Sequence, residues 1–174
     1  MSDPRALSAS GYEILVAREL RRVGIEPVGL RRRARGVRSG EHPEFAFDLL
    51  GQLEAYDRRW SALIGCSNRA DAASAAEIDG LRARARDAKA ASALLFVTSG
   101  FTDEAVRRAR EQRVALLRIV DAHGALLARG LIQPGPLPAW VPELTVELVV
   151  FEDERVQTQP VAPNEPELVL RQLR

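Results

Sequence analysis

Residues 47–68, FDLLGQLEAYDRRWSALIGCSN, consist of two apolar segments on either side of a polar turn. The second segment alternates with a period of two, as in a β-strand whose successive side chains point to opposite faces. One face takes Trp60, Ala62, Ile64 and Cys66, and the other takes Ser61, Leu63, Gly65 and Ser67. The first segment belongs to a strand that starts at about residue 45 and carries Asp48. The stretch therefore predicts a hairpin of two strands, with a carboxylate on the first.

The chain before this hairpin predicts a helix, a strand and a basic turn. Ser10 and Glu13 have the spacing of a capping box, and apolar residues follow at helical spacing until Gly24 ends the helix. Those residues are Tyr12, Leu15, Val16, Leu20 and Val23. A strand is then expected from Pro27, followed by the arginine-rich turn RRRARGVRSG at residues 31–40.

The chain after the hairpin alternates between helices and strands. Ser74 and Glu77 form a second capping box, which opens a helix that runs to about residue 90. Residues 92–98 are nearly all apolar, as expected of a strand covered on both faces. Thr102 is the expected N-cap of a third helix, and residues 114–120 form another buried strand. This order predicts an α/β fold with a mixed central sheet flanked by helices.

The composition changes towards the C-terminus. Prolines crowd residues 133–142, so we expect a linker over the surface there. Residues 143–152 have a strand-like apolar content, whereas QTQPVAPNEPE, residues 157–167, is expected to be a polar spacer before a short amphipathic end. We therefore expect a domain at residues 8–129 and a proline-rich extension at residues 130–174. This extension either completes an edge of the sheet or contacts a partner chain.

Composition restricts the class of protein. A chain of 174 residues with a net charge of +1 fits one domain with an extension, and no overall field draws it to nucleic acid or to an acidic membrane. The single Cys66 cannot form a disulfide framework or a zinc site, so a reducing cytoplasm is the expected location. No apolar run approaches the roughly 20 residues that span a bilayer, so we expect a soluble protein without a membrane partner. Lys89 is the only lysine, and the other basic residues are arginines.

Three stretches resemble the Mrr-like restriction endonucleases, a family within the PD-(D/E)xK nuclease superfamily. GYEILVARELRRVGI resembles the opening helix of that family, and FDLL followed by LIGCSN resembles its catalytic pair of strands. LLFVTSGFTDEAVRRAREQRVALLRIVD resembles its strand, turn, helix and final strand, and is the most specific of the three. The resemblance covers about residues 10–127. It implies a restriction-endonuclease-like core and a homodimer.

The resemblance also implies a magnesium site, and here the sequence departs from the family. Such nucleases hold Mg²⁺ with a carboxylate, and a lysine two residues after a second acidic or amide group helps to activate water. Asp48 matches the carboxylate, but the family's Gln-Cys-Lys corresponds to Gly65, Cys66 and Ser67. Glycine has no ligand atom and serine has no ammonium charge, so the motif is degenerate. Asp48 is then either a weak metal ligand or a polar strand residue without chemistry, and Mg²⁺ is expected only if the protein is active.

The other candidate residues each have two interpretations. Glu13 matches a glutamate that lies near the metal in some relatives, although its capping box explains it equally well. The arginines of the basic turn, together with Arg69, either grip the phosphates of DNA or form a solvated basic surface. The turn arginines are Arg31, Arg32, Arg33, Arg35 and Arg38. Cys66 is expected to be a small buried residue rather than a nucleophile.

Three functions fit these observations. In the first, the domain is a catalytically inactive or impaired Mrr-like nuclease that binds DNA through its arginine-rich loop, within a defence or genome-maintenance system. In the second, it is an active Mg²⁺-dependent endonuclease whose rearranged site uses Asp48, Glu44 or Glu13 and a displaced basic group. In the third, it is a non-enzymatic interaction or scaffold module, and residues 130–174 dock a protein partner or a second copy. We favour the first, with the third close behind it.

Overall fold

The computed structural model describes residues 3–35, 44–136, 138–139 and 141–174, and these residues form a seven-stranded mixed sheet. The strands lie side by side in chain order, β1 to β7. Only the pairs β3–β4 and β4–β5 in this sheet are parallel. The strands are β1 Glu26–Ala34, β2 Phe45–Ala55, β3 Arg58–Asn68, β4 Ser92–Val97, β5 Val114–Asp121, β6 Leu144–Glu152 and β7 Arg155–Pro160.

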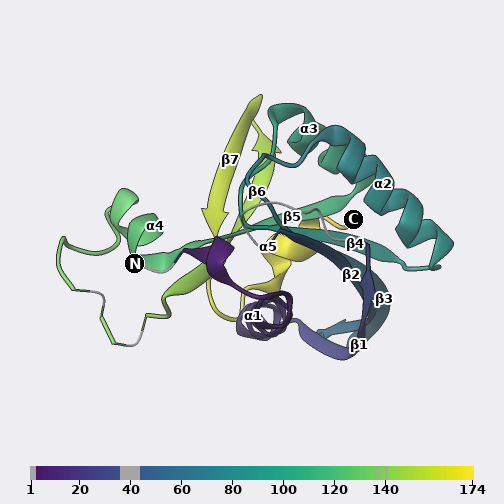
Figure 1. Cartoon of the computed structure of the whole chain (residues 1–174), viewed down its shortest axis with the longest axis horizontal. Helices are drawn as coiled ribbons and strands as arrows, with labels where there is room; N and C mark the ends of the chain where they lie inside the picture. Colours follow the sequence, from purple (N-terminus) through teal and green to yellow (C-terminus); the bar gives the residue numbers. More distant parts are fainter. Residues whose placement is uncertain (1–2, 36–43, 137, 140) are drawn as a thin grey trace.

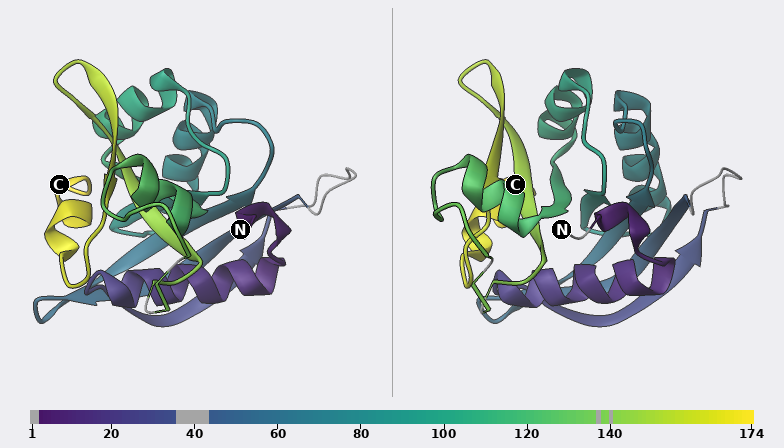
Figure 2. Two further views of the ribbon diagram at one scale, coloured as in Figure 1. Left: turned by 90° about the vertical axis from the view of Figure 1, so that its left-hand side faces the viewer. Right: turned by 60° about the vertical axis from the view of Figure 1, so that its left-hand side comes forward.

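Helices cover both faces of the sheet (Figure 1). On one face lie α1 (Ala9–Arg22) and the short α5 (Pro166–Arg171), and on the other lie α2 (Ala75–Asp87) and α3 (Asp103–Gln112). Figure 2 shows α1 running along the sheet on the side opposite α2 and α3. A short 3₁₀ turn, η1 (Pro4–Ala6), precedes α1, and α4 (Ala122–Ala128) follows β5. The predicted α/β fold with a mixed sheet flanked by helices is confirmed.

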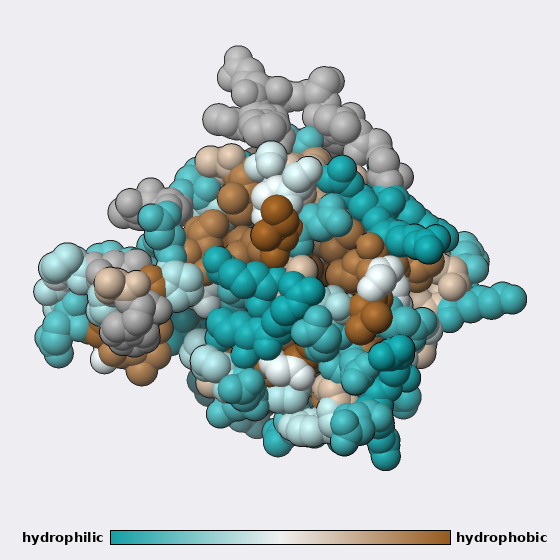
Figure 3. Space-filling model, turned by 90° about the horizontal axis from the view of Figure 1, so that it is seen from below, coloured by the Kyte–Doolittle hydropathy of each residue, from teal (hydrophilic) through white to brown (hydrophobic). Residues whose placement is uncertain are grey.

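Two hydrophobic cores hold these layers together, one on each face. The α1-side core contains Tyr12, Leu20, Phe47, Ile64, Cys66 and Phe96, among others. The α2-side core contains Leu63, Ile78, Leu81, Leu95, Val106 and Leu116, among others. Along β3, Ala62, Ile64 and Cys66 face the first core and Leu63 faces the second, so the predicted alternation is confirmed. Figure 3 shows the surface seen from below the view of Figure 1, where hydrophobic and hydrophilic patches lie side by side.

The start of α1 differs from the prediction. The N-cap is Ser8 rather than Ser10, and the Ser8 hydroxyl accepts a hydrogen bond from the Gly11 backbone N–H at 3.1 Å. This frame places Leu7 just before the cap and Tyr12 at the fourth helical position, which are the two positions of a hydrophobic staple; Tyr12 belongs to the α1-side core and Leu7 packs against that core. Glu13 therefore lies inside the helix and caps nothing.

The first four residues of the basic turn expected at residues 31–40 are strand, and residues 36–40 lie outside the described residues. Arg31, Arg32 and Arg33 belong to β1, whose pairing with β2 shifts register between Val28 and Arg31. Gly29 has a φ of 61° at this irregularity. The pairing satisfies the backbone while the arginine side chains, at the edge of the sheet, stay in water. Arg38 lies outside the described residues.

The C-terminal segment adds two strands to the same sheet. β6 pairs with β5, and β7 pairs with β6 through a turn at Asp153 and Glu154, whose φ values are both positive. Residues 157–160 are therefore strand, where a polar spacer was expected, because the hairpin supplies their backbone partners. The helix α4 was not predicted either; the Asp121 carboxylate caps it by accepting from Gly124 N–H at 2.7 Å. Within the part described, no helix is long and apolar enough to cross a bilayer.

The packing of β6 predicts a large difference between two leucines of the C-terminal segment. Leu148 is 1% exposed in the α1-side core, whereas Leu131 is 59% exposed. Leu148→Ala should lower the free energy of unfolding by about 2–5 kcal/mol, because it removes buried contacts and leaves a cavity. Leu131→Ala, the same chemical change, should alter it by less than about 0.5 kcal/mol. Urea denaturation followed by circular dichroism measures both, and equal midpoints would show that β6 lies outside the cooperative core.

Candidate functional site

The β2–β3 hairpin brings the three family positions onto one face of the sheet. Asp48 is paired with Gly65, and Ser67 is paired with Ala46 on the same side. Residues opposite each other in an antiparallel pair share a face, and Gly65 faces Leu81 and Leu95 of the α2-side core. Asp48, Gly65 and Ser67 therefore look towards α2.

The Asp48 carboxylate is clamped between two arginines. Its side chain is almost completely buried, with 3% of the residue exposed. Arg84 of α2 donates from Nε to Oδ2 at 2.8 Å and from Nη2 to Oδ1 at 3.3 Å. Arg35, at the end of β1, places its Nε 3.0 Å from Oδ1. Both carboxylate oxygens are thus occupied by guanidinium groups.

Sequence reasoning missed Arg84. The helix was predicted, and Ile78, Leu81 and Ala85 are buried on its inner face. Arg84 follows Leu81 by three positions, so it projects from the edge of that face towards the sheet. This spacing was the available signal. That the guanidinium meets Asp48, however, depends on how α2 sits over the hairpin.

Leucine side chains fill the space beside Gly65. A Cβ atom at this position would lie 2.9 Å from Leu95 Cδ1 and 3.1 Å from Leu81 Cδ1. The first distance is closer than carbon atoms in a folded protein approach one another. A glutamine or glutamate cannot be accommodated at Gly65 unless both leucines move. Glycine at this position therefore leaves room for the two leucine side chains of the α2-side core.

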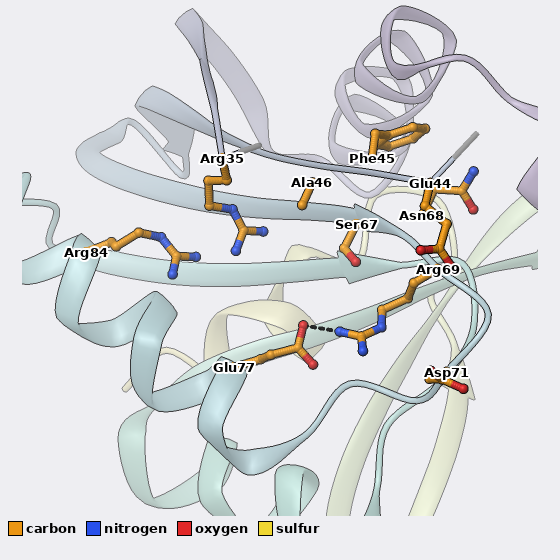
Figure 4. Close-up of a pocket in the computed structure, with 10 residues that line it drawn as sticks. All are labelled: Arg35, Glu44, Phe45, Ala46, Ser67, Asn68, Arg69, Asp71, Glu77 and Arg84. Atoms are coloured by element: carbon orange, nitrogen blue, oxygen red, sulfur yellow. Dashed lines mark hydrogen bonds and ion pairs between the residues drawn. The ribbon is translucent and has the colours of Figure 1, made fainter. Parts of the chain in front are cut away.

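An open cavity of about 600 Å³ lies in front of Ser67. Figure 4 shows Ser67, Arg35 and Arg84 directed towards this space from β3, β1 and α2. On another wall, Arg69 Nη1 forms an ion pair with Glu77 Oε1, and Glu77 also accepts from Ser74 N–H at 2.9 Å. The remaining lining residues are Glu44, Phe45, Ala46, Asn68 and Asp71.

The electrostatics of this cavity favour an anion near Arg35. Burial lowers the pKa of Arg35 from its ordinary value; the Asp48 carboxylate opposes that shift, and the nearby Arg84 charge adds to it. Two guanidinium groups thus share one carboxylate. Cys66 lies on the other face of the sheet, where burial, with a smaller contribution from Asp48, raises the pKa of its thiol well above the ordinary value. Cys66 is a neutral core residue, which is unsuited to nucleophilic attack.

The other predicted site residues are divided between the two faces. Arg31 and Arg33 pair with Leu50 and Asp48, so they share the Asp48 face, and Arg69 lines the cavity. Arg32 points to the opposite face, where its guanidinium lies 3.6 Å from the Glu13 carboxylate and stacks over Phe47. The sheet therefore separates Glu13 from Asp48. Lys89 is also remote, because its carbonyl accepts from Ser61 at the opposite end of β3.

A family model for the Mrr catalytic domain, described as a restriction endonuclease, matches residues 4–123. This match includes η1, α1 to α3 and β1 to β5. The chain belongs to the Mrr-type restriction endonuclease family. Comparisons with curated proteins and with solved structures found no match.

Nucleases of the Mrr type use Mg²⁺, and the donor set around Asp48 does not fit that ion. Magnesium takes near-octahedral oxygen ligands, mostly carboxylate and water. Here both Asp48 oxygens already accept from cations, and Gly65 supplies no ligand and no room for one. Among the described residues, no group of three or more His, Cys, Asp or Glu side chains could hold a metal ion. Where the Mrr-type motif predicts a carboxylate that holds Mg²⁺, this site has a carboxylate, Asp48, that is bound by Arg35 and Arg84.

The close contacts at Gly65 predict that any side chain at this position, including the family's glutamine, lowers the stability of the protein. Gly65→Ala should lower the free energy of unfolding by about 1–3 kcal/mol, because the new methyl group forces Leu95 or Leu81 to move. Gly100→Ala is the matched control, since nothing lies within 4 Å of a Cβ at that position. Chemical denaturation of both variants checks this. If Gly65→Ala is as stable as the wild type, the two leucines repack freely, and position 65 can accommodate a side chain.

Proposed function

We propose that this domain is a DNA-binding nuclease fold that does not cleave DNA. The observation that carries the proposal is the clamp on Asp48: the carboxylate that should hold a metal ion is buried and neutralised by Arg35 and Arg84. Guanidinium groups bound to both oxygens compete with Mg²⁺ for the carboxylate. The clamp therefore excludes the ion from the position where the family motif needs it.

The chemistry of arginine supports the absence of hydrolysis. In a metal-dependent nuclease, a bound ion and a lysine together stabilise the hydroxide that attacks phosphorus. Arg84 supplies positive charge, but a guanidinium remains protonated and is a poor proton acceptor. Ser67, in the lysine position, has a short neutral side chain. No group around Asp48 combines the charge and the proton transfer that the reaction needs.

The arginines that share the Asp48 face support the binding of DNA. Arg31 and Arg33 are exposed along the edge strand β1, and Arg35 and Arg84 follow at the cavity. Arginine side chains on such an edge can contact successive phosphates, and each phosphate neutralised releases counterions from the DNA. Contacts of this type position the duplex without reading its sequence. The net charge of +1 makes this local group of arginines the source of any attraction.

A rearranged active site is the second candidate, because the cavity retains carboxylates. Glu44 and Glu77 line it together with Arg84, which is a basic group displaced from the lysine position. Glu77 is engaged by Arg69 and by the start of α2, and Glu44 accepts from Ala70 N–H at 3.4 Å. The homodimer and a protein partner for residues 130–174 stay predictions.

The proposal predicts no phosphodiester cleavage. Supercoiled plasmid incubated with the protein and either Mg²⁺ or Mn²⁺ should remain intact, and Asp48→Ala should give the same result, because Asp48 has no metal to hold. Agarose gel electrophoresis over a range of protein concentrations measures nicking. Metal-dependent nicking that disappears in Asp48→Ala would establish the rearranged active site instead.

The proposal also predicts that DNA binding needs no divalent metal and depends on the exposed arginines of β1. Arg31→Ala and Arg33→Ala should each reduce the slope of log affinity against log salt by about 0.9, because each removes one phosphate contact. Arg171→Ala, a similar loss of charge on α5, should leave the slope unchanged. Fluorescence anisotropy with a labelled duplex in EDTA is the measurement. Equal effects of all three variants would show that the attraction is not local to β1.

A further inference from the structure

We propose that the cavity in front of Ser67 binds a phosphate group without a metal ion, and that Asp48 is the internal competitor for the arginines that receive it. The inference rests on the proposed function, since it describes how the inactive site is used. In a metal-dependent nuclease the carboxylate attracts the phosphate indirectly, through the ion. Here the same carboxylate holds Arg35 and Arg84 in place and opposes the arrival of an anion.

The donors for a phosphate converge on one end of the cavity. Arg35 and Arg84 are part-buried, with 22% and 34% of their side chains exposed, and both line the cavity, where Arg35 lies between Arg84 and Ser67 (Figure 4). Arg35 Nε is near Asp48 but not aligned for a hydrogen bond, so it has no hydrogen-bond partner within the described residues. Arg69 Nε is buried and has none there either. A phosphate in the cavity would instead meet the guanidinium ends of Arg35 and Arg84 and the Ser67 hydroxyl, which are directed into it (Figure 4).

The cavity lining as a whole carries three arginines and three carboxylates, and only its Arg84 end has an excess of positive charge that favours an anion. Arg35 and Arg84 face one carboxylate, Asp48, which leaves one positive charge in excess. Arg69 is balanced by Glu77. Arg33 and Asp87, which line the adjoining depression, offset each other. Glu44 and Asp71 line the cavity on the side of Arg69 and Asn68, away from Arg84 (Figure 4).

The shape and size of the cavity point to a phosphate carried by a larger molecule. Guanidinium groups present planar pairs of donors that match phosphate oxygens, and a hydroxyl such as that of Ser67 adds a further donor. The cavity volume of about 600 Å³ exceeds that of a single phosphate. The phosphate is therefore either part of a DNA backbone or the terminal group of a strand or nucleotide. Both sources share the chemistry of the site and are separated by the test below.

The test follows inorganic phosphate binding by isothermal titration calorimetry in EDTA at constant ionic strength. Asp48→Asn keeps the shape and one acceptor but removes the competing charge, so phosphate should bind about tenfold more tightly than to the wild-type protein. Arg84→Gln should weaken binding about tenfold, because it removes a charged donor. Glu19→Gln is the matched control: Glu19 is also a buried carboxylate held by two arginines, Arg18 and Arg22, but lies on α1. Its phosphate affinity should equal that of the wild type.

The outcomes are distinct from those of the DNA experiments. Unchanged or weaker phosphate binding by folded Asp48→Asn overturns the competitor role, and unchanged binding by Arg84→Gln overturns the site even if Asp48→Asn fails to fold. Phosphate binding with the expected variant effects, but no affinity for duplex DNA, would remove the proposed function and leave this site standing. A second arm compares duplexes with and without a 5′-phosphate. A preference for the phosphorylated end assigns the site to terminal phosphates, and equal affinity, with competition by inorganic phosphate, assigns it to the backbone.

Discussion

A carboxylate taken out of water needs compensation by charge, and the arrangement of this site depends on how that need is met. An unpaired buried carboxylate is too costly to persist, so it is neutralised or paired. Three acidic residues are buried in the described structure: Asp48, Glu19 and Glu147. Each is held by two arginines, Glu19 by Arg18 and Arg22, and Glu147 by Arg118 and Arg129. Asp48 thus follows a pattern that this arginine-rich chain uses at places with no link to the nuclease motif.

The clamp on Asp48 and the glycine beside it are consequences of one helix. Arg84 and Leu81 both belong to α2, and the first reaches the Asp48 carboxylate while the second fills the space beside Gly65. A side chain at Gly65 would require Leu95 or Leu81 to move. The close packing at Gly65 and the ion pair at Asp48 therefore both involve side chains of α2.

The C-terminal segment is part of the same structure. β6 pairs with β5, and Leu144, Val146, Leu148 and Val150 complete the α1-side core together with Val169 of α5. Glu147 of β6 binds Arg118 of β5 and also Arg129, which follows α4. The ion pair between Arg129 and Glu147 therefore connects the end of α4 to the sheet. Within the described residues, the apolar side chains of this segment pack into the core of the domain.

The sequence by itself determined the order of the elements, because hydrophobic period and capping residues are local. The hairpin with its alternation, the cap of α2 at Ser74 and the buried β4 and β5 all follow from such patterns. The resemblance to the family also predicts that the lysine and the second ligand are missing. Tertiary structure decided the rest: strand pairing over residues 31–34, where the start of a basic turn was expected, and β7 in place of a spacer. It alone brought Arg84 to Asp48 and placed Glu13 on the other face, because contacts between residues 36 positions apart depend on how layers pack and not on local spacing.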